Sequence, residues 1–165
     1  MKGAKVLFSS TTTDKTTQEW ETPQKLFNYL NSRLHFELDA AATPENAKCP
    51  AFYTADDDGL KQVWAPRRVW LNPPYGRNVG IWVKKSYEES QNGALVVCLL
   101  PARTDTAWFA DYCMKAGQIW FFRGRLRFGD SVNGAPFPSM LVFFSVCMEG
   151  TEPKIYVFRP ERWGG

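Results

Sequence analysis

The sequence predicts an α/β fold: a mainly parallel sheet covered by helices, with an antiparallel strand pair toward the C-terminus. Strand-like segments alternate with helix-like segments, which is typical of a parallel sheet with crossover helices. Ala94–Leu100 is apolar throughout, as expected for a strand buried on both faces. No convincing helix separates Gln118–Phe122 from Met140–Val146, so we expect these two strands to pair antiparallel.

Length and composition favour one globular domain. The 165 residues leave little room for a separate recognition domain, and 44% hydrophobic residues exclude an intrinsically disordered chain. We expect a flexible N-terminal tail over residues 1–18, a single domain over 19–148, and a C-terminal extension over 149–165 that can add an edge strand. The formal net charge of +3 at pH 7 permits nucleic-acid binding without proving it.

The elements expected before residue 72 are short. Thr22 followed by Pro23 is typical of a helix start, with Thr22 as the N-cap. Phe36–Asp39 predicts a strand, and the Thr-Pro pair at 43–44 predicts a second helix start. Arg68–Leu71 predicts the next strand of the sheet.

The later part of the chain predicts two longer helices and an edge strand. Val79–Gln91 has helical spacing, with Val83 on the inward face and charged residues on the outward face. Asp105–Lys115 also reads as a helix, and Lys154–Phe158 as a strand at the edge of the sheet.

The cysteines do not form a metal motif. The four cysteines are scattered, contain no C-x-x-C pair and share the chain with a single histidine, His35, so we expect no metal site. Neither a secretory signal nor an apolar run of membrane length is present. We therefore expect a soluble protein of a reducing, cytoplasmic compartment.

The tetrapeptide Asn72-Pro73-Pro74-Tyr75 directly follows the apolar run Val69–Leu71. The prolines fix the backbone and have no N–H, which leaves the nearby carbonyls free to accept hydrogen bonds. The Asn72 side-chain oxygen and the Pro73 carbonyl can together hold the two hydrogens of a planar amine, while the Tyr75 ring stacks on a flat heterocycle. We interpret the motif as a site that holds an amino nitrogen while it attacks a methyl donor. The alternative is a proline-rich turn with an exposed tyrosine.

This chemistry needs no covalent nucleophile. The amine is a weak nucleophile because its lone pair is drawn into the ring, and hydrogen-bond acceptors would push the nitrogen toward tetrahedral geometry. They would also hold it close to the methyl carbon, where proximity lowers the barrier. An amine that belongs to duplex DNA must first be flipped out of the base stack.

Two other segments are expected beside this motif, because ligands of an open parallel sheet bind at the carboxyl ends of its strands. Asp39 ends a strand, and the small residues Ala40 and Ala41 would let the backbone approach a cofactor that carries a carboxylate and a sulfonium. Asp58 could accept a hydrogen bond from an adenine amino group. A plain strand–helix connection and an acidic surface loop are the respective alternatives.

Basic residues suggest contacts with nucleic acid. Arg123, Arg125 and Arg127 alternate with small or apolar residues, so three guanidinium groups can lie along a phosphate backbone. A strand with a charged outer face is the alternative. Arg103 is a further candidate for phosphate contact, and the proline-rich segment 133–139 either lines the target pocket or only connects strands.

Six segments carry a family resemblance: Glu19–Pro23, Leu38–Ala47, Asp57–Leu60, Asn72–Tyr75, Leu100–Thr106 and Phe122–Leu126. Together they resemble the compact, phage-type DNA adenine-N6 methyltransferases of the Dam-like family. The resemblance implies a Rossmann-like fold, S-adenosylmethionine as cofactor and adenine N6 in double-stranded DNA as methyl acceptor, often within GATC. A phage-encoded protein of this kind would act in the cytoplasm of its bacterial host.

The resemblance also implies roles for individual residues. Cofactor contacts are implied for Trp20, Thr22, Pro23, Asp39, Ala40, Ala41 and Asp58. Catalysis is implied for Asn72, Pro73, Pro74 and Tyr75. We expect DNA contacts from the arginines named above, no membrane or metal partner, and a monomer or weak dimer.

Two other functions are compatible with the sequence. Asn-Pro-Pro-Tyr also serves methyltransferases that act on RNA adenines and on protein glutamine amides, because these substrates also present a planar amine. The second alternative is a DNA-binding protein that has this fold but no activity.

Overall fold

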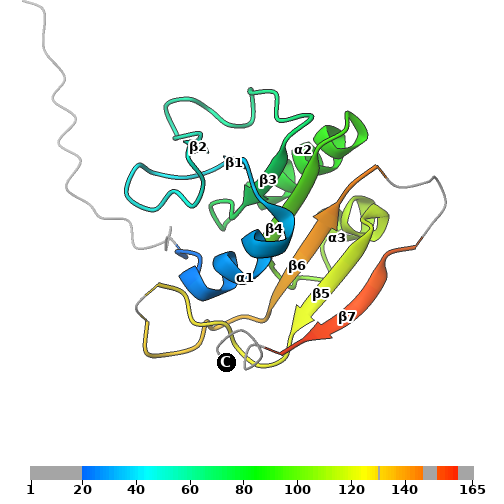
Figure 1. The fold of residues 1–165 in the computed structure, drawn as a ribbon. Coiled ribbons are helices and arrows are strands. Elements are labelled where there is room, and N and C mark those ends of the chain that lie inside the picture. The colour runs from blue at the N-terminus through cyan, green and yellow to red at the C-terminus, as the bar shows by residue number, and fades with distance from the viewer. Residues whose placement is uncertain (1–19, 130, 147–151, 160–165) are drawn as a thin grey trace, which may run out of the picture.

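The computed structural model describes residues 20–129, 131–146 and 152–159 of the chain. These residues form one mixed sheet flanked by helices on both faces (Figure 1). The tail expected over residues 1–18 lies outside the described residues. Within the described part of the chain, no helix is long and apolar enough to cross a membrane.

The sheet has the strand order β2-β1-β3-β4-β6-β5-β7. Its strands are β1 (Leu38–Asp39), β2 (Ala51–Phe52), β3 (Arg68–Leu71), β4 (Leu95–Pro101), β5 (Gln118–Phe122), β6 (Ser139–Phe144) and β7 (Lys154–Phe158). The first four strands are parallel to one another, whereas β6 is antiparallel to both of its neighbours, β4 and β5. β7 pairs parallel with β5 and lies at the edge of the sheet.

The helices cover the two faces of the sheet separately. α1 (Gln24–Leu34) lies on one face, and α2 (Val79–Gln91), α3 (Ala107–Asp111) and the 3-10 turn η1 (Cys113–Lys115) lie on the other (Figure 1). The residues of β4 alternate between the two cores. Val97 and Leu99 pack with α1, and the residues between and beside them pack with α2 and α3. Burial of a strand on both faces explains why the whole of β4 is apolar.

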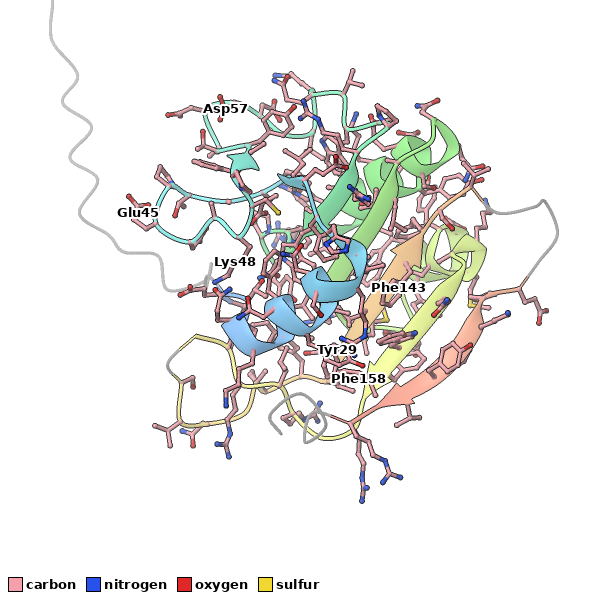
Figure 2. All side chains as sticks on the ribbon, in the orientation of Figure 1. Tyr29, Glu45, Lys48, Asp57, Phe143 and Phe158 are labelled. Atoms are coloured by element: carbon pink, nitrogen blue, oxygen red, sulfur yellow. The ribbon has the colours of Figure 1, made fainter. Side chains whose placement is uncertain are left out.

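Aromatic side chains close the core between α1 and the C-terminal strands. Tyr29 of α1 lies 5.5 Å from Phe158 of β7, measured between ring centroids (Figure 2). Trp120 of β5 lies 4.7 Å from Phe143 of β6. Trp120 also stacks on Phe158 at 5.2 Å. This cluster ties the edge strand β7 to the body of the domain.

Most predicted elements are confirmed. β3, β5 and α2 occupy the predicted residues, and β5 pairs antiparallel with β6 as expected. The short strand β2 was not predicted, because two residues are too few to show any alternation of apolar and polar side chains. The helix expected over Asp105–Lys115 is interrupted, and forms α3 followed by the separate 3-10 turn η1.

Two predicted helix starts are wrong in detail. The Thr-Pro pair at 43–44 begins only a single turn, in which the Thr43 carbonyl accepts from the backbone N–H groups of Asn46 and Ala47. The Thr43 N–H is itself bonded to the Asn46 side chain and is not free for a ligand. α1 begins at Gln24 with Pro23 as its N-cap, so Thr22 does not cap the helix.

A buried glutamate joins α2 to the segment that precedes β3. Glu89 Oε2 accepts hydrogen bonds from the backbone N–H groups of Trp64 (2.8 Å) and Ala65 (2.9 Å), and Oε1 pairs with Lys85. Burial alone would raise the pKa of Glu89. The hydrogen bonds from Lys85, Ala65 and Trp64 outweigh it, and the pKa lies below its ordinary value. The carboxylate therefore stabilises the fold in its ionised form.

Glu89→Ala is expected to lower the free energy of unfolding by about 3 kcal/mol, because two backbone N–H groups and one lysine lose their buried partner. Since the folded pKa is depressed, this stabilisation is present above the unfolded value near 4.5 and is lost as the pH falls below it. Urea unfolding at pH 7 and pH 4 measures both effects. Glu88→Ala is the control, because the Glu88 carboxylate forms only an exposed pair, with Lys84, among the residues that the structure describes, and its removal should change little. Equal losses in the two variants would contradict the assignment.

Candidate functional site

A cavity of about 500 Å³ lies at the carboxyl ends of β1 and β3. The chain leaves β1 toward the outer strand β2 and returns to β3 on the inner side, so this edge is the point where the strand order reverses. Ligands of open α/β sheets bind at such a point. The cavity is lined by Trp20, Glu21, Thr22, Asp39, Ala41, Ala42, Thr43, Asn46, Lys48, Thr54, Ala55, Asp58, Gly59, Asn72, Pro73, Pro74, Tyr75 and Trp82.

The Asn72 amide is held with its oxygen free. Nδ2 donates to the backbone carbonyl of Trp20 and to Oγ1 of Thr22, the latter at 3.1 Å. The buried Oδ1 accepts no hydrogen bond from any residue that the structure describes. An unpaired buried acceptor is uncommon in folded proteins and costs about 1–3 kcal/mol, so Oδ1 is suited to a donor supplied by a ligand.

The Tyr75 side chain is fixed at both ends. Its hydroxyl donates to the carbonyl of Leu99 in β4 at 3.1 Å, and its ring meets Phe137 and Phe128 edge-on, with centroids 5.5 and 6.2 Å away. Burial raises the pKa of Tyr75 well above its ordinary value, so the phenol stays neutral at physiological pH. The same two phenylalanines also contact Trp20 edge-on. Tyr75 therefore supplies a rigid aromatic surface rather than a base.

A second cavity of about 430 Å³ adjoins the first at Trp20 and Tyr75, which line both. It combines aromatic walls with two cations. The residues that line it are Trp20, Tyr75, Gly76, Arg77, Val79, Pro101, Arg103, Thr106, Trp108 and Phe137. Arg77 was not predicted as a site residue, although its place two residues after the Asn-Pro-Pro-Tyr motif is a signal in the sequence.

Asp39 is a buried carboxylate on the wall of the first cavity. It is only 3% exposed, and it accepts hydrogen bonds from the backbone N–H groups of Lys48 (3.0 Å) and Ala41 (3.4 Å). Burial raises the pKa of Asp39 to about 6, although these bonds and the charge of Lys48 oppose the rise. The loop from β1 to β2 thus wraps around an acid that titrates close to neutral pH.

Lys48 brings a positive charge to the same cavity. Its Nζ lies 3.2 Å from Oε1 of Glu21 and 3.1 Å from Oε1 of Gln24, so the loop between β1 and β2 is tied to the start of α1 (Figure 2). Sequence reasoning missed Lys48, because nothing in the local sequence shows that this lysine folds back onto a segment more than twenty residues earlier.

Gly59, in the segment before β3, packs closely against Ala40, which directly follows β1. A Cβ on Gly59 would stand 2.3 Å from the backbone oxygen of Ala40, so only glycine fits there. Asp58 lines the cavity beside it and has a positive φ of 52°. Its carboxylate pairs with Lys61 at 2.8 Å on the surface. The neighbouring Asp57 is bonded within its own loop, because its carboxylate accepts hydrogen bonds from the backbone N–H and the hydroxyl of Thr54.

Most of the residues predicted as site residues lie around these two cavities. Pro23 and the buried Ala40 do not line the first cavity. Arg103 lines the second cavity. Phe137 is the only member of the proline-rich segment 133–139 that reaches it.

The arginine run lies apart from both cavities. Arg123, Arg125 and Arg127 follow β5 in an exposed loop, so the strand offered as an alternative for this run is wrong. No ion pair joins them to another residue that the structure describes. The same loop continues to Phe128, which contacts Trp20 and Tyr75.

Comparisons with known proteins point to one family. A family model described as DNA N-6-adenine-methyltransferase (Dam) matches residues 9–159. The chain is 40% identical over 110 residues to the DNA N-6-adenine-methyltransferase of Escherichia phage T1, across 66% of this chain and 46% of the relative. It is 28% identical over 134 residues to the DNA N-6-adenine-methyltransferase of Haemophilus phage HP1, across 76% of this chain and 77% of the relative.

The chain therefore spans less than half of the T1 relative and about three quarters of the HP1 relative. The family model, in contrast, covers most of the 165 residues, which confirms the resemblance noted in the sequence. The chain belongs to the DNA N-6-adenine-methyltransferase (Dam) family.

Proposed function

We propose that the protein transfers the methyl group of S-adenosylmethionine to the exocyclic N6 of a flipped adenine in double-stranded DNA. The observation that carries this proposal is the buried Oδ1 of Asn72, which has no hydrogen-bond partner among the described residues and belongs to a side chain that lines the first of two adjoining cavities. One cavity suits a charged cofactor, and the other suits a flat base beside cations.

The residues of the first cavity fit the proposed cofactor. The Lys48 cation suits a carboxylate, and Asp39 suits the cationic groups near it. Ala41, Ala42 and Gly59 let the backbone approach a ligand closely. Bound there, the cofactor would supply an electrophilic methyl group.

Asn72 and Pro73 would act on the amine of the substrate. Asn72 Oδ1 and the Pro73 carbonyl would accept its two hydrogens, which draws the lone pair out of conjugation and fixes the nitrogen for in-line attack. Stacking of the base on Tyr75 contributes about 1–3 kcal/mol. The buried cysteines do not compete as nucleophiles, because burial raises the pKa of Cys98 and of Cys49 to about 12.

The second cavity is the proposed site of the flipped base. Its aromatic walls, Trp108 and Phe137 among them, suit a planar ring, and Arg77 and Arg103 suit the flanking phosphates. The exposed arginines after β5 would extend the contact along the DNA backbone. We propose GATC as the target sequence and a monomer or weak dimer as the active form.

A methyl-transfer assay tests the function. Labelled S-adenosylmethionine is incubated with unmethylated DNA, RNA and a glutamine-containing peptide, and the product is digested for nucleoside analysis. Label in N6-methyladenine from DNA, and protection of GATC sites from methyl-sensitive nucleases, is the expected result. Transfer to RNA or to the peptide alone would mean that RNA or a protein amide, and not DNA, is the substrate. A failure to bind the cofactor would mean that the chain is a DNA-binding protein without methyltransferase activity.

The raised pKa of Asp39 predicts that stability and cofactor affinity change in opposite directions with pH. Its folded pKa of about 6 exceeds the ordinary value of 3.8, so its ionisation makes the unliganded protein less stable as the pH rises through this window. A cationic cofactor favours the ionised form, so its affinity should fall by up to about tenfold for each pH unit below 6. Calorimetric titration between pH 5 and 8 measures the affinity. Asp39→Asn should flatten the profile, and an unchanged slope in that variant would remove Asp39 from the site.

A further inference from the structure

We propose that Thr22 is a positioning residue. Its hydroxyl, together with the Trp20 carbonyl, holds the Asn72 amide in the orientation that leaves Oδ1 available to the substrate amine. This inference rests on the proposed function of Asn72 as the acceptor for the substrate amine. It gives Thr22 a task different from the cofactor contact that the family resemblance implies.

The lock uses both hydrogens of the Asn72 amide. One reaches the Trp20 carbonyl, which can only accept, and the other reaches Thr22 Oγ1 at 3.1 Å. Rotating the amide by half a turn would set Oδ1 against the Trp20 carbonyl, with two acceptors facing each other. The reverse orientation is therefore disfavoured, and Oδ1 is kept free for a donor.

Thr22 bonds to Asn72 and does not cap helix α1. A threonine directly before a proline at a helix start is a typical N-cap, yet no side chain caps α1 and its N-cap is Pro23. The Thr22 hydroxyl, in a residue only 4% exposed, is instead bonded to a side chain 50 residues later in the sequence. Departures from local rules of this kind are expected where function competes with helix stability.

The segment that holds the amide is itself held from two sides. The Trp20 ring packs edge-on against Phe128 and Phe137 at 5.3 and 5.1 Å. Glu21 pairs with Lys48 on one side, and its carbonyl accepts from the N–H of Gly129 at 3.0 Å on the other. Residues 20–22 are thus fixed by the cofactor-side loop and by the loop after β5, so the Asn72 amide has a rigid support.

The test compares Thr22→Val, which keeps the shape and loses the hydroxyl, with Thr22→Ser, which keeps the hydroxyl. At saturating cofactor and DNA, Thr22→Val should lower kcat by up to about 100-fold, since a misplaced acceptor misplaces the amine. Its Kd for S-adenosylmethionine should stay near the wild-type value, and Thr22→Ser should restore kcat. Thr104→Val is the matched control, because Thr104 is exposed and lines neither cavity.

Several outcomes would overturn the proposal. They are an unchanged kcat in Thr22→Val, a loss confined to the cofactor Kd, or an equal loss in Thr22→Ser. If Thr22→Val does not fold, a second measurement decides. The two amide protons of Asn72, assigned by their disappearance in Asn72→Asp, should exchange slowly with water in the NMR spectrum of the wild-type protein, and fast exchange would refute the lock.

The NMR measurement also separates this inference from the proposed function. A wild-type protein that methylates no DNA would refute the function, while slowly exchanging Asn72 protons would still support the lock. An active protein with rapidly exchanging Asn72 protons would instead support the function and refute the lock.

Discussion

Asn72→Ala is expected to reduce methyl transfer by about 1,000-fold while leaving the affinity for S-adenosylmethionine within a few-fold of the wild-type value. The variant removes the acceptor that would hold the substrate amine and the two hydrogen bonds that Nδ2 donates to Trp20 and Thr22, and leaves the other residues that line the cofactor cavity unchanged. Asn72 Oδ1 accepts nothing from the described residues, so its loss breaks no acceptor contact within them.

The expected loss lies in the chemical step. Single-turnover transfer of a labelled methyl group to DNA measures that step, and calorimetry measures cofactor binding. Asn92→Ala serves as the control, because Asn92 follows α2 on the exposed surface and lines neither cavity. Near wild-type transfer by Asn72→Ala would remove Asn72 from its proposed role. A parallel loss of cofactor affinity would mean that the change had disturbed the cavity instead.

Tyr75→Ala should lower kcat/KM for DNA by about 10- to 100-fold, which corresponds to the loss of one base-stacking contact. Tyr75→Phe should lose much less, because the ring that stacks is retained along with its contacts to Phe128 and Phe137. The hydroxyl is not idle, since it donates to the carbonyl of Leu99. Its removal is expected to lower stability by about 1 kcal/mol.

The two Tyr75 variants separate stacking from positioning. Steady-state kinetics on DNA, with thermal unfolding of each variant, distinguishes a catalytic loss from a structural one. Equal losses of kcat/KM in Tyr75→Ala and Tyr75→Phe would count against stacking and would assign the effect to the hydrogen bond with Leu99.

Elements with a strong local pattern could be predicted from the sequence. The apolar run of β4 indicates a strand that is buried on both faces, and the helical spacing of α2 indicates a helix that buries one face. β2 and the turn at Thr43 could not be predicted. A strand of two residues carries no periodicity, and the Thr-Pro helix signal was overridden by the Asn46 side chain.

The candidate site divides in the same way. The Asn-Pro-Pro-Tyr motif is contiguous, so its residue types alone indicate an acceptor beside an aromatic ring. Lys48 carries no such local signal, because what matters about it is the cavity that its side chain reaches. Arg77 has only its place near the motif as a signal, and the sequence does not show which cavity its side chain reaches.

The sequence by itself determined the α/β class and the family and predicted the chemical type of the site, because these depend on local patterns and contiguous motifs. Only the tertiary structure decided which atoms of those motifs are free. Trp20 and Thr22 meet Asn72 across 50 or more positions of the chain. The Trp20 carbonyl, which can only accept, selects which end of the amide faces outward, and the Thr22 hydroxyl helps to hold it there. The raised pKa of Asp39 likewise follows from burial, which arises only when the loop from β1 to β2 closes over it.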